Sequence, residues 1–130
     1  MDPTASFVMQ ALNTVLSQPE HQETTIGNFF APDYRQTVNG ISLNYRDFVS
    51  HLAILKQLTR SMTVKVLTIA SQENRVLTHH QVTACKTGGG KSVSEVFACF
   101  TVREGRIVEC QELTRLISGA TEDNEFGSVH

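Results

Sequence analysis

The period of the hydrophobic pattern changes near Ser61, and this change limits the folds open to the chain. Before that point apolar residues recur every three or four positions, whereas after it they alternate or form short β-branched runs. The first spacing is typical of amphipathic helices and the second of strands. Helices followed by strands predict an α+β fold, in which three N-terminal helices pack on the concave face of a curved antiparallel sheet.

The first helix is predicted over residues 4–18. Its apolar stripe consists of Phe7, Val8, Ala11, Leu12 and Val15. Thr4 or Ser6 is the expected cap, and Pro19 is expected to end the helix because proline cannot continue one.

A short second helix is predicted within residues 20–34, since Ile26, Phe29 and Phe30 share a helical face. Pro32 is then expected to stop or turn the chain. Two short extended pieces follow around Asn39-Gly40, a dipeptide typical of tight turns.

The third helix is predicted over residues 44–58. Asn44 is a suitable N-cap with Asp47 three residues later. The apolar stripe consists of Tyr45, Phe48, Leu52 and Leu55. His51 lies at the edge of this stripe, where exposure to solvent is expected more often than a role at a pocket.

Four strands are predicted after Ser61, over residues 62–72, 75–86, 92–102 and 107–117. Short turns join them, including the glycine-rich residues 88–90, so they should form an antiparallel meander. Residues 118–130 form a polar tail, and we expect residues 1–130 to be one domain. Helices covering one face of a curved sheet leave a cone, which is a natural small-molecule pocket.

Alternation along the strands predicts which side chains face the helices. Over residues 92–102 the inward set is Val96, Ala98, Phe100 and Val102. The outward set, Val93, Glu95, Phe97 and Cys99, is unusually apolar for a solvated face. A large apolar outer face usually marks an interface, and we therefore expect a homodimer through the sheet.

The adjacent histidines His79 and His80 should point to opposite faces, His80 inward and His79 outward, provided that the strand has no bulge. The inward neighbours of His80 are then Val76, Thr78, Val82 and Ala84. Over residues 62–72, the pattern places Val64, Val66 and Thr68 on one face, against Lys65, Leu67 and Ile69. Over residues 107–117 both faces hold an acid and apolar residues, so the pattern alone does not place Glu112.

Several motifs, in this order and spacing, resemble the nuclear transport factor 2-like superfamily, most closely its SnoaL-like (polyketide cyclase-like) branch. They are FFAPDY (residues 29–34), HHQVTACK (79–86), GRIVECQELT (105–114) and DNEFGS (123–128). The resemblance implies a cone-shaped α+β fold with an internal pocket, often dimeric through the sheet. It does not imply one activity, because the superfamily includes cyclases, isomerases, dehydratases, epoxide hydrolases and binding modules.

The resemblance also implies that polar pocket residues come from the fourth strand and the last strand, which here are His80 and Glu112, with Glu112 inside. The aspartate or arginine that several of these enzymes carry in the fourth strand is absent. His80 is a candidate general base and Glu112 its partner or an acid. The alternatives are a core histidine bonded to a neighbour and a buried carboxylate tied to a helix or to Arg115.

The remaining candidate residues would bind the ligand. Tyr34 could donate its hydroxyl hydrogen bond or simply pack. His51 could join at the pocket mouth, and Phe30, Phe48 and Val82 would supply apolar wall.

Composition excludes several classes of function. A net charge of −2 without a basic cluster argues against nucleic acid and membrane surfaces. No apolar run is long enough to span a bilayer, and no signal peptide is recognised. Three cysteines without a CxxC motif predict reduced thiols in a cytoplasmic protein. No ligand spacing suggests a metal, and no cofactor is expected.

Two functions remain open. The first is a pocket domain that binds a small, largely apolar molecule. The alternative is a cofactor-independent isomerase, cyclase or dehydratase in which His80 and Glu112 transfer protons and Tyr34 stabilises an oxyanion.

Overall fold

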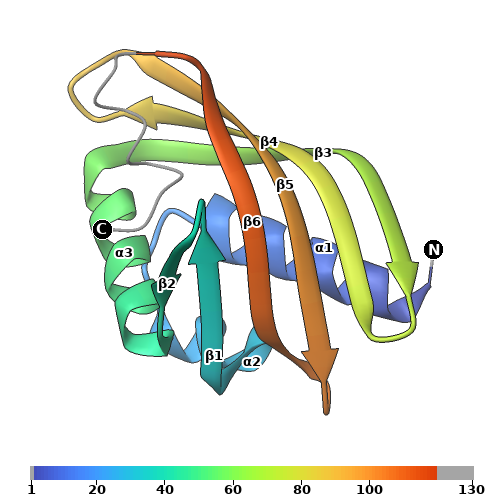
Figure 1. Cartoon of the computed structure of the whole chain (residues 1–130). Coiled ribbons are helices and arrows are strands. Elements are labelled where there is room, and N and C mark those ends of the chain that lie inside the picture. Colours follow the sequence, from blue (N-terminus) through green and yellow to red (C-terminus); the bar gives the residue numbers. More distant parts are fainter. Residues whose placement is uncertain (1, 120–130) are drawn as a thin grey trace.

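Three helices lie inside the curve of a six-stranded sheet (Figure 1). This computed structural model describes residues 2–119, so most of the predicted polar tail lies outside the described residues. The helices are α1 (Pro3–Ser17), α2 (Glu23–Phe29) and α3 (Tyr45–Leu58). The strands are β1 (Phe30–Val38), β2 (Ile41–Leu43), β3 (Thr59–Gln72), β4 (Arg75–Lys86), β5 (Lys91–Arg103) and β6 (Arg106–Ser118). The predicted α+β cone is confirmed.

The strand order is β2-β1-β6-β5-β4-β3. Strands β3 to β6 form the predicted antiparallel meander. The sheet as a whole is mixed, because β1 pairs with β6 in parallel and with β2 in antiparallel. Asn39 and Gly40, at φ of 50° and 85°, make the tight turn between β1 and β2, as the sequence predicts.

Two helix boundaries differ from the prediction and one agrees. Asp2, rather than Thr4 or Ser6, caps α1, because its carboxylate accepts a hydrogen bond from the Thr4 amide at 2.9 Å. Asn44 caps α3 as predicted, accepting from the Asp47 amide at 2.9 Å. The second helix ends at Phe29, so Phe30 belongs to a strand and not to the helical face.

Pro32 lies within β1 instead of stopping the chain. The pairing of β1 with β6 is irregular between Phe30 and Arg35, around the proline. Proline has no amide hydrogen for the sheet ladder, so it is tolerated where pairing is interrupted. The chain therefore passes from α2 directly into the sheet.

Two bulges change which residues face the core. In β3 the register shifts between Val66 and Thr68, so Ile69 packs against the core and Thr68 is exposed, the reverse of the simple alternation. In β6 the extra residue is Val108, and Ile107 and Cys110 are both buried. A bulge places two residues opposite one, so alternation changes phase there.

The pairing of β4 with β5 is unbroken from Arg75 to Cys85. His79 and His80 therefore lie on opposite faces, as predicted. His80 is 2% exposed on the inner face, and His79 is half-buried on the outer face. Among residues 2–119, no helix combines the length and hydrophobicity needed to cross a membrane.

Candidate functional site

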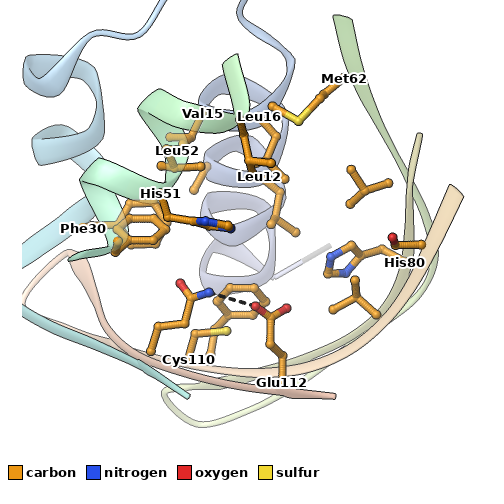
Figure 2. Close-up of a pocket in the computed structure, with 18 of the residues that line it drawn as sticks. Leu12, Val15, Leu16, Phe30, His51, Leu52, Met62, His80, Cys110 and Glu112 are labelled. Carbon is orange, nitrogen blue, oxygen red and sulfur yellow. Dashed lines mark hydrogen bonds between the residues drawn. The ribbon is translucent and has the colours of Figure 1, made fainter. Parts of the chain in front are cut away.

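A cavity of about 110 Å³ lies between α1, α3 and the concave face of the sheet (Figure 2). Its wall is mainly aliphatic and aromatic. Seven residues singled out from the sequence contribute to this wall: Phe30, Tyr34, Phe48, His51, His80, Val82 and Glu112. The fold thus brings these candidate residues together at one cavity, although they come from four different elements.

Aromatic rings close one side of the cavity. The ring centroids of Phe30, Tyr34 and Phe48 are each 4.8 Å from the other two. All three residues are buried. Tilted and edge-on ring pairs at this distance are favourable, and they leave the cavity open instead of filling it.

Glu112 is held in the cavity by a short chain of hydrogen bonds. The Tyr34 hydroxyl donates to Gln36 Oε1 at 2.8 Å, and Gln36 Nε2 donates to Glu112 Oε1 at 2.9 Å. The alternative partner, Arg115, bonds Glu95 on the other face of the sheet. The Tyr34 hydroxyl proton is therefore directed to Gln36 and not to the centre of the cavity.

The environment of Glu112 favours its neutral form. Burial raises the pKa of its carboxyl from 4.5 to about 7, although the hydrogen bond from Gln36 acts in the opposite direction. Taking a carboxylate out of water penalises the charged form. Glu112 consequently exists in both protonation states near neutral pH, which is the range that suits an acid or base.

His80 has its own partner. Its Nδ1 lies 2.9 Å from the Thr78 hydroxyl, two residues earlier on the same face of β4. Burial, with a smaller contribution from His79, lowers the pKa of His80 from 6.5 to about 4. His80 is therefore neutral at pH 7.

Strand β5, with Ala98 and Val96 on its inner face, separates Glu112 from His80. In the register of the sheet, Glu112 lies beside Ala98 and Ala98 lies beside Thr78, while His80 lies beside Val96. Strands two apart are separated by about 10 Å. The His80 imidazole and the Glu112 carboxyl point into the same space across this strand (Figure 2).

His51 of α3 also faces the cavity (Figure 2). It is half-buried, whereas exposure was the expectation from its position at the edge of the helical stripe. Groups from α3, β4 and β6 thus converge on one apolar chamber. Among residues 2–119, no three His, Cys, Asp or Glu side chains are arranged to hold a metal ion.

Several polar residues of the cavity wall were not predicted from the sequence. These are Gln36, Ser92 and Ser94, together with Thr78 behind His80. Alternation along β1 could have found Gln36, because it follows the buried Tyr34 by two residues. Its bond to Glu112 depends on the pairing of β1 with β6, which no local pattern reveals.

The outer face of the sheet carries a second group of side chains. The ring of His79 stacks on that of Phe97 with centroids 4.2 Å apart, and His79 Nε2 lies 2.7 Å from Glu95 Oε2. Arg115 Nε donates to Glu95 Oε1 at 2.7 Å. Large apolar side chains are exposed on strands β3 to β6: Leu67, Leu77, Phe97, Leu113 and Ile117.

Known proteins share both the sequence pattern and the fold. Residues 9–110 match the SnoaL-like domain. An uncharacterised protein of Schizosaccharomyces pombe is 34% identical over 124 residues, which cover 95% of each chain.

Two solved structures illustrate the similarity of fold. IdmH of Streptomyces antibioticus, a candidate polyketide cyclase, superposes with a TM-score of 0.73 at 16% identity, covering 87% of this chain and 92% of its own. An epoxide hydrolase of Mycobacterium tuberculosis superposes with a TM-score of 0.70 at 17% identity, covering 95% and 87%. At these identities the likeness concerns the fold, and the match of the domain family shows that the chain belongs to the SnoaL-like family.

Proposed function

We propose that this protein binds a small, neutral, mainly apolar molecule with one hydrogen-bond acceptor such as a carbonyl oxygen. The observation that carries the proposal is the convergence of His51, His80 and Glu112 on one mainly apolar cavity. Ligand sites are typically apolar chambers with a few polar groups that orient the ligand.

The size of the cavity limits the ligand. A cavity of about 150 Å³ holds benzene, and the volume here is about 110 Å³. A compact ring of about six heavy atoms therefore approaches the capacity of the cavity as it stands. Larger ligands require the helices to move away from the sheet.

The charge of the wall limits the ligand further. Among the described residues that line the cavity there is no lysine or arginine, and Glu112 is the acidic one. An anion would lose its hydration without gaining a cationic partner, which is costly. A neutral acceptor can instead take the proton of Glu112 when that carboxyl is protonated.

Cyclopentanone is a suitable probe, with cyclopentanecarboxylate as the charged counterpart. We expect the ketone, titrated at pH 6, to shift the amide NMR signals of residues that line the cavity, and the carboxylate to leave them unchanged. Ser94→Leu should abolish the shifts by filling the space, whereas Val93→Leu, on the opposite face of β5, should retain them. Equal shifts for Ser94→Leu and the wild type would contradict the proposal.

Proton transfer is the second candidate, because Glu112 is poised near pH 7 and neighbours a place for a carbonyl ligand. Glu112 would then be the acid or base, and His80, with its low pKa, would act as a neutral orienting group. The fold does not select a reaction, since structures as similar as a candidate cyclase and an epoxide hydrolase share it.

Hydrogen–deuterium exchange at the carbon beside the cyclopentanone carbonyl separates the two candidates. Proton abstraction by Glu112 would give faster exchange with the wild type than with buffer, and Glu112→Gln would remove the acceleration. Exchange at the buffer rate, together with ketone binding, would favour a binding function alone.

We also propose that the outer face of the sheet pairs with a second copy of the chain. The apolar residues Leu77, Phe97 and Leu113 span β4 to β6 and are each at least half exposed. A stable interface needs about 800 Å² from each partner. Three strands of about 12 residues cover an area of about 600 Å² by their spacing and rise, so an interface that extends to β3 reaches the required size.

A further inference from the structure

We propose that Gln36 is a positioning residue, which holds Oε1 of Glu112 and leaves Oε2 as the oxygen that meets the ligand. This inference rests on the proposed function, because it concerns the same cavity. Gln36 itself lines the cavity and carries no charge.

The position of Gln36 on β1 buries its side chain and orients its amide. Tyr34 and Gln36 are two residues apart, so both face inward, and they are 1% and 8% exposed. Burial raises the pKa of Tyr34 well above its usual value, so its hydroxyl keeps its proton at neutral pH. That hydroxyl donates to Gln36 Oε1 at 2.8 Å. The amide is thereby oriented, with its NH₂ group directed away from Tyr34.

The parallel pairing of β1 with β6 brings this NH₂ group to Glu112. Gln36 is in register with Cys110, and Val38 with Glu112, so Gln36 and Glu112 are diagonal neighbours on the inner face. Gln36 Nε2 donates to Glu112 Oε1 at 2.9 Å (Figure 2). An amide nitrogen donates only, so Oε1 must remain an acceptor.

The consequence concerns the proton of Glu112. When the carboxyl is protonated, the proton resides on Oε2, since Oε1 already accepts from Gln36. Oε2 then donates to an acceptor in the cavity, and after ionisation it accepts from a donor there. Tyr34, Gln36 and Glu112 thus present one defined oxygen to the ligand.

A reversed amide would have the opposite effect. Gln36 Oε1 would then accept the proton of Glu112, and the hydrogen bond would stabilise the neutral carboxyl instead of the ionised one. A hydrogen bond to the charged form lowers a carboxyl pKa, and one to the neutral form raises it. The two arrangements therefore differ in the sign of the pKa change when Gln36 is replaced.

The test is a ¹³C NMR titration of the Glu112 side-chain carboxyl in the wild type and in Gln36→Met. We expect the midpoint to rise in Gln36→Met by roughly half a pH unit or more, because a bond to the ionised form is lost. Tyr34→Phe should raise it less, since the amide remains but is no longer oriented. Gln111→Met, next to Glu112 but on the outer face, should leave the midpoint unchanged.

A fall in the midpoint, or no change, in Gln36→Met would overturn the assignment. If Gln36→Met does not fold, an unchanged or lower midpoint in Tyr34→Phe decides against it equally. Cyclopentanone binding to the wild type is measured separately. Binding with an unchanged Gln36→Met midpoint would refute the positioning role alone, whereas absence of binding would refute the proposed function.

Discussion

The opposite pKa changes of Glu112 and His80 predict an unusual dependence of stability on pH. Burial raises the pKa of Glu112 from 4.5 to about 7 and lowers that of His80 from 6.5 to about 4. One pH unit corresponds to about 1.4 kcal/mol. Each group therefore changes the free energy of unfolding by up to about 3 kcal/mol across its range.

The signs of the two contributions oppose each other. The folded protein binds the Glu112 proton more tightly than the unfolded chain, so this contribution is fully present below pH 4.5 and is lost as the pH rises to about 7. The unfolded chain binds the His80 proton more tightly, so that contribution is present above pH 6.5 and is lost as the pH falls to about 4. Between pH 4.5 and 6.5 they largely cancel in the wild type.

Glu112→Gln removes the contribution of Glu112 to the pH dependence of stability and leaves that of His80. Relative to the wild type, the free energy of unfolding of Glu112→Gln should increase by up to about 3 kcal/mol between pH 4.5 and pH 8. Urea unfolding at fixed protein concentration, followed by circular dichroism at several pH values, measures this difference. Glu109→Gln, an exposed change on the same strand, should run parallel to the wild type. A Glu112→Gln curve that is also parallel to the wild type would show that folding does not raise the pKa of Glu112.

Two further predictions concern the scaffold and the interface. Asn44→Ala removes the cap of α3 and should lower the free energy of unfolding by about 1 kcal/mol. The melting temperature should then fall by about 4 °C. The exposed control Ser50→Ala should leave the melting temperature unchanged, and equal melting temperatures for Asn44→Ala and the wild type would contradict the capping role. Phe97→Asp places a charge on the proposed interface, so light scattering at micromolar concentration should give a dimer mass for the wild type and a monomer mass for the variant. A monomeric wild type would contradict the dimer, and Gln10→Asp, an exposed change on α1 and not on the sheet, should leave the mass unchanged.

Local patterns predict most of the scaffold here. Alternation separated His79 from His80 correctly because β4 contains no bulge against β5. Alternation failed at Ile69, because Leu67 is an extra residue in β3 that reverses the faces of the residues after it. It could not place Glu112, because Val108 is an extra residue in β6 with the same effect. A bulge depends on how two strands pair, and neither strand records it alone.

The candidate site, like the scaffold, combines features that local sequence patterns predict with features that depend on strand pairing. Tyr34, His80 and Glu112 were recognisable by residue type and by resemblance, and all three line the cavity. The role of Gln36 depends on the parallel pairing of β1 with β6, two segments more than 70 residues apart. The direction of each pKa change depends on burial, which is a property of the assembled core.

The affinity of the wild type for cyclopentanone as a function of pH shows whether the Glu112 carboxyl binds the ligand. The Glu112 carboxyl donates to the ketone only when it is protonated, and a hydrogen bond of this kind is worth about 1 kcal/mol. We predict that the dissociation constant rises roughly five- to tenfold between pH 5.5 and pH 8.5 with a midpoint near pH 7, and that it stays constant in Glu112→Gln. A wild-type affinity that does not change across this range would exclude Glu112 as the hydrogen-bond donor, and no binding at any pH would exclude the proposed ligand site.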